Sequence, residues 1–141
     1  MAHTHLYNLR RRAFEQQRGF CHYCGLPMWQ DDEAAFAARF GLSARLTRLL
    51  RSTAEHLVAR CDGGRDECSN IVAACHWCNE RRHLKRANAA PSAEVYLHRV
   101  ACRMAAGQWH PANRCLHNKT PPNSKGSSSP LPENPWRVQQ L

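Results

Sequence analysis

The sequence has no long apolar run and comparatively few acidic residues. No stretch approaches the roughly 20 consecutive apolar residues that a membrane-spanning helix needs. Residues 1–12 are polar and basic, and they lack the apolar stretch of a secretory signal. We therefore expect a cytoplasmic protein with no membrane partner. In a reducing compartment the eight cysteines are better explained by metal binding than by a disulfide framework.

Acidic side chains are outnumbered by basic ones. The 141 residues include 20 Lys and Arg against 11 Asp and Glu, which gives a formal net charge of +9. An excess of this size favours a polyanionic partner, and nucleic acid is the usual one. A solvated basic surface or an affinity for anionic membranes would give the same composition.

The spacing of apolar residues predicts an α+β fold. Helices are expected in four regions, of which the second holds two short ones: 6–17, 31–51, 79–86 and 93–106. Strands are expected at 53–59 and 70–74, joined by a turn at Gly63-Gly64.

The length and the change in composition near the C-terminus predict one domain and a tail. Residues 118–141 are rich in Pro, Ser, Asn and Gly, which indicates disorder. The remainder, 1–117, is long enough for a single modest core. Within it we place three parts, namely a core at 19–90, a helical insert at 31–52 and a C-terminal helix at 92–106. The insert superficially resembles a helix-turn-helix, but a packing role is favoured over DNA reading.

Four of the cysteines form two Cys-x-x-Cys pairs. Cys21 and Cys24 make the first pair, and Cys75 and Cys78 make the second. Zinc prefers four nitrogen or sulfur ligands in a tetrahedron, and two such pairs supply four thiolates. Because residues 25–74 separate the pairs, a shared ion would clamp remote parts of the chain together. We expect a structural Zn²⁺ site, with ordinary buried or free thiols as the alternative.

Other cysteines and histidines lie near these pairs. His22 and His76 lie inside the two turns and are alternative zinc ligands. Cys61 and Cys68 flank the glycine turn, and we expect them to be free thiols, with a second weak pair as the alternative.

Between the two pairs lie residues suited to cleaving a phosphodiester. That reaction needs a base to deprotonate water and a hard cation to neutralise charge on the phosphate and the leaving oxygen. His56 can be the base, because imidazole titrates near neutrality. Glu55 precedes it on the expected strand, so its side chain faces the opposite way. It reaches a metal only if the strand bends or the ligand approaches from the edge.

The order of these residues resembles the HNH nuclease family. The matching motif runs as Glu55-His56, Gly63-Gly64, Asn70 and Cys75-x-x-Cys78-Asn79. Similar proteins form a ββα-metal (His-Me) finger, in which two strands and one helix surround a single divalent ion. The resemblance covers about residues 10–90, and its specific part is 53–83.

The resemblance implies a role for each matching residue. His56 would be the general base of a metal-dependent DNA endonuclease. Asn70 would orient His56 or brace the intervening loop by hydrogen bonding. Asn79, at the start of the finger helix, would share the catalytic Mg²⁺ or Mn²⁺ with Glu55. His83, one turn further along, is an additional candidate ligand or phosphate contact.

Two positions depart from the family pattern. Glu55 stands where the family usually has Asp, and its longer side chain shifts the metal by about one methylene. Ala59 stands where the family usually has Pro, which loosens the loop after the first strand. Both changes bear on rate and on metal preference.

The expected finger helix is strongly basic. Its cationic residues are Arg81, Arg82, Lys85 and Arg86. We expect them to contact DNA phosphates, with a solvated basic face as the alternative. Contacts to the backbone do not read bases, so weak sequence specificity is expected, for a monomer or a homodimer. The rival functions are a non-catalytic zinc-stapled DNA-binding module and a zinc-dependent interaction protein with no nucleic-acid role.

Overall fold

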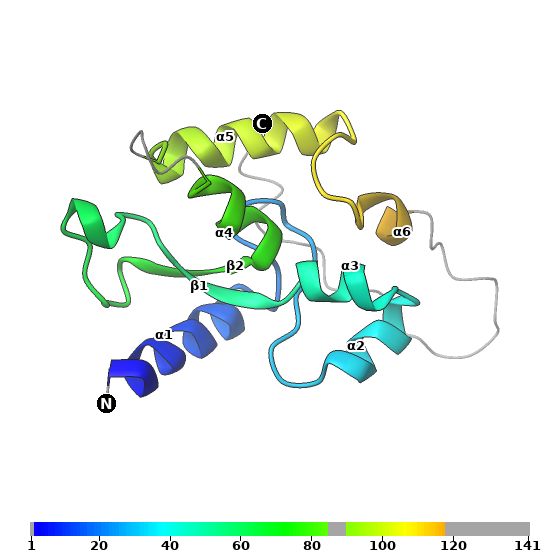
Figure 1. Cartoon of the computed structure of the whole chain (residues 1–141), viewed down its shortest axis with the longest axis horizontal. Coiled ribbons are helices and arrows are strands. Elements are labelled where there is room, and N and C mark those ends of the chain that lie inside the picture. The colour runs from blue at the N-terminus through cyan, green and yellow to red at the C-terminus, as the bar shows by residue number, and fades with distance from the viewer. Residues whose placement is uncertain (1, 85–89, 118–141) are drawn as a thin grey trace.

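A computed structural model describes residues 2–84 and 90–117 and has the predicted α+β fold (Figure 1). Its centre is an antiparallel pair of strands, β1 (Ser52–His56) and β2 (Ile71–Cys75). Helices surround this pair: α1 (Ala2–Gln16), α2 (Glu33–Phe40), α3 (Ala44–Leu49), α4 (His76–Arg82), α5 (Ala93–Ala105) and α6 (Asn113–His117). The expected tail at 118–141 lies outside the described residues.

Local capping sets the two short helices of the insert. Asp32 caps α2 by accepting a hydrogen bond from the amide of Ala35 at 2.9 Å, and Ser43 caps α3 through the amide of Leu46 at 3.3 Å. Gly41 ends α2 in the left-handed region, at φ 58°. The prediction of two helices within 31–51 is confirmed.

The first strand is shorter than the predicted 53–59, because the chain leaves the sheet after His56. The last cross-strand hydrogen bond runs from the Leu57 amide to the Asn70 carbonyl, at 2.9 Å. Beyond it the loop folds tightly back on itself. A Cβ added at Gly64 would lie 1.7 Å from the carbonyl oxygen of Val58. Only glycine lets the two backbone segments come this close, which explains why residue 64, the second of the Gly63-Gly64 pair, is glycine.

The helix after β2 begins earlier than expected. A turn at 75–78 and a helix over 79–86 were predicted, but α4 starts at His76, with Cys75 as its extended N-cap residue. Cys78 therefore lies in the first turn, and Asn79 lies inside the helix rather than at its start. An N-cap residue and a residue three positions later lie on the same side of a helix, which lets both thiols face one ion.

The core is built from the end of α1 and the loop after it, from β2 and α4, and from α5, which lies beside α4 in Figure 1. Tyr96 and Val100 of α5 are buried, as are Leu50 and Ala73 on the opposite side. The Tyr96 hydroxyl donates to the carbonyl of Cys78 at 2.7 Å and so joins α5 to α4. The helix predicted over 93–106 is confirmed, whereas α6 was not predicted. Over 2–84 and 90–117, no helix combines the length and apolar character needed to cross a bilayer.

Candidate functional site

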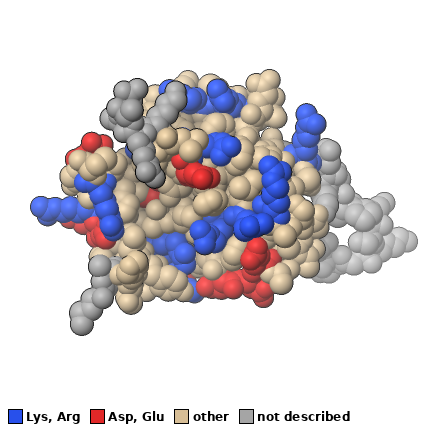
Figure 2. Space-filling view, in the orientation of Figure 1, with Lys and Arg blue, Asp and Glu red and all other residues tan. Residues whose placement is uncertain are grey.

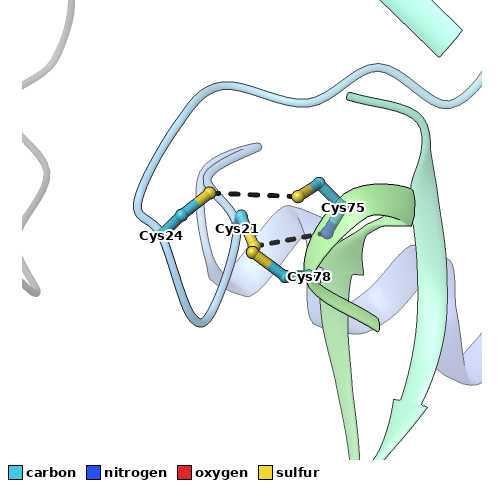
Figure 3. A group of neighbouring side chains, drawn as sticks. All are labelled: Cys21, Cys24, Cys75 and Cys78. Carbon is cyan, nitrogen blue, oxygen red and sulfur yellow. Dashed lines mark hydrogen bonds between the residues drawn. The ribbon is translucent and has the colours of Figure 1, made fainter. Parts of the chain in front are cut away.

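The four cysteines of the two pairs converge on one point (Figure 3). Their sulfur atoms all lie within 4.8 Å of one another, and the Cys24 and Cys75 sulfurs are 3.9 Å apart. Sulfurs placed 2.3 Å from a tetrahedral zinc ion are about 3.8 Å apart. Cys75 and Cys78 are fully buried, and Cys21 and Cys24 are nearly so. The cluster fits a structural zinc site that ties the loop after α1 to β2 and α4.

The surroundings of the thiols also suit a bound cation. Burial raises the pKa of Cys24, and it raises those of Cys75 and Cys78 strongly. Burial also opposes ionisation of Cys21, but hydrogen bonds from the three other thiols bring its pKa well below the usual value. The Cys75 amide and the Trp109 indole N–H donate to the sulfurs of Cys21 and Cys78, each at 3.2 Å. Several buried thiolates need a cation to balance their charge.

The remaining candidates near the cluster lie apart from it. His22 and His76 are not among the clustered ligands of the described residues, and His76 instead faces Glu80, with Nε2 and Oε2 3.6 Å apart. Cys61 and Cys68 are exposed and free, as predicted. Among the described residues, the group that could hold the ion therefore consists of four cysteines.

His56, at the end of β1, pairs with a carboxylate that the sequence analysis missed. Its Nε2 atom lies 2.8 Å from Oδ1 of Asp66, and the guanidinium of Arg60 holds both oxygens of the same carboxylate at 3.0 and 2.8 Å. The hydrogen bond with His56, followed by that with Arg60, lowers the pKa of Asp66. The Arg60 Nε–H group also donates to this Nε2 atom at 3.2 Å, so Asp66 and Arg60 together hold one edge of the imidazole. No regular spacing in the sequence marks Asp66, which lies in the loop between the strands.

Glu55 faces the other side of β1 and is buried, with 1% of its surface exposed. The Tyr23 hydroxyl donates to its Oε1 at 3.1 Å, and Arg82 forms an ion pair with the same oxygen. The Nε2 atom of His83 lies 3.2 Å from Oε2 and 3.3 Å from Oε1. Two ligands at right angles on a divalent ion, each about 2.1 Å away, are about 3.0 Å apart. The Glu55–His83 separation fits a shared ion, and it equally fits a hydrogen bond.

Asn79 lies on the same side of β1 as Glu55. Its amide nitrogen donates to the Thr53 hydroxyl at 2.9 Å and to the Ala54 carbonyl at 3.2 Å. Both bonds use Nδ2, so neither engages Oδ1, the atom that binds hard cations. Asn79 and His83 are four residues apart at the end of α4, which brings both toward this face of the strand.

Asn70 braces the loop that leads away from His56. Its Oδ1 accepts from the Val58 amide at 2.8 Å, and its Nδ2 donates to the carbonyls of Val58 and Arg65 at 3.1 and 3.0 Å. The resemblance implied two roles for Asn70, and these bonds are of the bracing kind. They hold the loop that bears Arg60 and Asp66.

Arg82 is buried, whereas a residue that binds DNA phosphates must be exposed. It is 4% exposed. One guanidinium nitrogen binds Glu55 and the His56 carbonyl, and the other reaches the Leu57 carbonyl at 2.9 Å. The expectation that Arg82 contacts DNA is corrected by this burial. The cause is the position of α4: Arg82 follows Asn79 by three residues and shares its sheet-facing side.

Of the remaining basic residues that were expected to contact DNA, the structure describes only Arg81. Arg81 stacks on the indole of Trp77, with its guanidinium carbon 3.1 Å from the ring centre. Lys85 and Arg86 lie outside the described residues.

Comparison with known proteins identifies one segment. Residues 44–85 match the family model described as HNH endonuclease. The matched segment includes α3, both strands and α4. It confirms the resemblance to the HNH family that the sequence motif indicated. No curated protein and no solved structure matches the chain.

Proposed function

We propose that this chain, with its HNH endonuclease segment at residues 44–85, is a metal-dependent endonuclease that hydrolyses DNA phosphodiester bonds. The observation that supports this most is the arrangement at the end of β1. His56 lies on one face of the strand with its Nε2 bound to Asp66, and Glu55 lies on the other face beside His83. A phosphate approaching the strand from its end would have a base on one side and metal ligands on the other.

His56 would act through Nδ1. In the reactive form that we propose, Nε2 would donate its proton to Asp66 rather than accept from Arg60, which would leave Nδ1 able to take a proton from water. As the oxygen of that water bonds to phosphorus, the bond to the leaving sugar oxygen breaks. The imidazolium so formed would be stabilised by the Asp66 carboxylate, which stays ionised.

Glu55 and His83 would hold the catalytic Mg²⁺ or Mn²⁺, with Asn79 supplying its amide oxygen. The bound ion would supply positive charge to the phosphate and to the leaving oxygen. Arg82 pairs with the buried carboxylate of Glu55 and fixes its position. The zinc site is structural in this proposal, because four thiolates leave no open coordination position.

A second candidate is a zinc-stapled DNA-binding module that does not cleave. The observation that favours it is the buried ion pair, since Arg82 already neutralises the carboxylate that would bind the metal. In this case Glu55, Arg82 and His83 form a structural network. DNA is the partner under both candidates, with weak sequence specificity and either a monomer or a homodimer as the binding unit.

The experiment that separates the two uses zinc-loaded protein and supercoiled plasmid with Mg²⁺ or Mn²⁺. His56→Ala is compared with wild type, and His98→Ala serves as the matched control because His98 lies exposed on α5. Zinc content and duplex affinity are measured for each protein. Nicking that only His56→Ala abolishes, with unchanged affinity, supports the endonuclease. Salt-sensitive binding without nicking by wild type supports the module, and negligible binding rejects both.

A further inference from the structure

Two adjoining hollows follow the junction of α1, β1 and α3. The first, of about 610 Å³, lies between α1 and residues 51–54, and Tyr7 and Arg10 are among its lining residues. The second, of about 540 Å³, is lined by Trp29, Glu33, Leu49 and His76 together with the arginines of α3. Arg51 lines both hollows, so they meet at its side chain. We define the arginine track as the four arginines that line it: Arg10, Arg51, Arg48 and Arg45.

Within the described part of the chain, no carboxylate pairs with the arginines of this track. Arg45, Arg48 and Arg51 are exposed, and none of the four forms an ion pair with another residue in 2–84 or 90–117. Arg60, by contrast, is bound to Asp66. The one carboxylate in the lining is that of Glu33. Figure 2 shows Lys and Arg side chains forming a band across the middle of this face, over the region where α1, β1 and α3 meet in Figure 1.

The track is built on ordered backbone. Arg45 and Arg48 are three residues apart on α3, whose other side is anchored by the buried Thr47. The Arg51 amide donates to the Arg48 carbonyl at 3.2 Å, and the Arg51 carbonyl accepts from the His76 amide at 2.9 Å. The row of arginines is therefore held against the start of both β1 and α4.

The track leads toward His56. Ala54 lines the first hollow, and the side chains of Ala54 and His56 leave β1 on the same face. His56 follows Arg51 by five positions, or about 16 Å along an extended strand at about 3.3 Å per residue. Phosphates of one DNA strand advance about 3.4 Å each along the duplex axis, so this length corresponds to about five of them.

We propose that the arginine track binds the phosphate backbone of duplex DNA that flanks the cleaved bond. This inference rests on the proposed function for the position of the cleaved bond, but binding by the track does not depend on cleavage. Guanidinium groups in a concave row match the spacing and charge of a backbone and contribute no base readout. The sequence analysis had assigned phosphate binding to the helix after β2, but Arg82 of that helix is buried. We assign phosphate binding to the arginine track instead.

The test measures the affinity for a 20-base-pair duplex over a range of salt concentrations, without catalytic divalent ions. The track variant is Arg45→Gln with Arg48→Gln. The control is Arg99→Gln with Arg114→Gln, which removes the same charge from exposed positions on α5 and α6. Zinc content and thermal unfolding verify that both variants fold.

The track variant is expected to bind at least about tenfold more weakly at low salt, with a slope of log affinity against log salt smaller by about two. The control is expected to stay within about twofold of wild type. Equal affinities for track variant and control overturn the proposal, whether or not the protein nicks DNA. Loss of affinity in the track variant, in a protein that never nicks, upholds the track and rejects the endonuclease.

Discussion

Asp66 accepts a hydrogen bond from His56, with 2.8 Å between Oδ1 and Nε2. The two residues meet because Asn70 and Gly64 fold the loop after β1 back toward the strand. This contact orients the imidazole, and it makes the loop part of the candidate site.

Asp66→Asn removes the charge that stabilises a protonated His56. We expect nicking to slow by roughly 10- to 1000-fold, while duplex affinity stays unchanged, because the pair acts on the proton transfer. The control is Asp62→Asn, an exposed carboxylate in the same loop. Equal nicking rates for the two variants would show that Asp66 has no part in positioning the base.

Gly64→Ala is expected to destabilise the fold far more than Gly63→Ala. A Cβ at Gly64 meets the Val58 carbonyl, whereas a Cβ at Gly63 has no atom within 4 Å. Gly63 has φ +88°, so its substitution costs only the backbone strain of about 1 kcal/mol. We expect a loss of about 3 kcal/mol at Gly64. Urea unfolding followed by tryptophan fluorescence measures both, and equal losses would contradict the close approach.

Removal of zinc is expected to unfold the protein. Cys75→Ser leaves three thiols, and the free energy of metal binding is then lost from the free energy of folding. We expect less than one bound zinc ion per chain and a much lower thermal midpoint. Cys61→Ser is the control, because Cys61 is exposed and lies outside the cluster. A Cys75→Ser protein with wild-type zinc content and midpoint would refute the staple.

Acid is expected to weaken the fold through His110. Burial lowers the pKa of its imidazole to about 4, and its Nδ1 accepts a hydrogen bond from the Ala112 amide at 3.0 Å. Between pH 4 and about 6.5 the unfolded chain binds more protons at this residue than the folded chain does. The stabilisation is therefore complete above about pH 6.5 and declines as the pH falls toward 4, by up to about 3 kcal/mol.

His110→Gln provides the comparison for this prediction. The free energy of unfolding of wild type and variant is measured from pH 7 to pH 4, so that zinc release, which affects both, cancels in the difference. The variant should lose less stability than wild type over this range. Parallel curves would mean that His110 is not responsible.

Local signals predicted the parts of the site that depend on few residues. Two Cys-x-x-Cys pairs define the zinc ligands, because four soft ligands at this spacing have one plausible use. The spacing of apolar residues predicted the two helices of the insert, and the structure adds that Asp32 and Ser43 cap them. The opposite facing of Glu55 and His56 followed from the alternation of a strand.

Contacts that depend on the folded chain were beyond the sequence. Asp66 reaches His56 only because the loop between the strands folds back. No motif or spacing in the sequence indicates this contact. The role of Arg82 was mistaken because α4 was expected to be exposed, whereas its side that bears Asn79 and Arg82 packs against β1. Arg82 lies on the side of α4 that faces Glu55. The sequence had instead led us to expect Arg82 on the surface.

Metal-dependent nicking of supercoiled plasmid by wild type and His56→Ala tests the central claim most directly. The account predicts nicking by wild type with Mg²⁺ or Mn²⁺, and a rate lower by roughly 100- to 10,000-fold in the variant at equal DNA affinity and zinc content. Wild-type protein that binds DNA but does not nick it, or a variant that nicks as fast as wild type, would contradict the account.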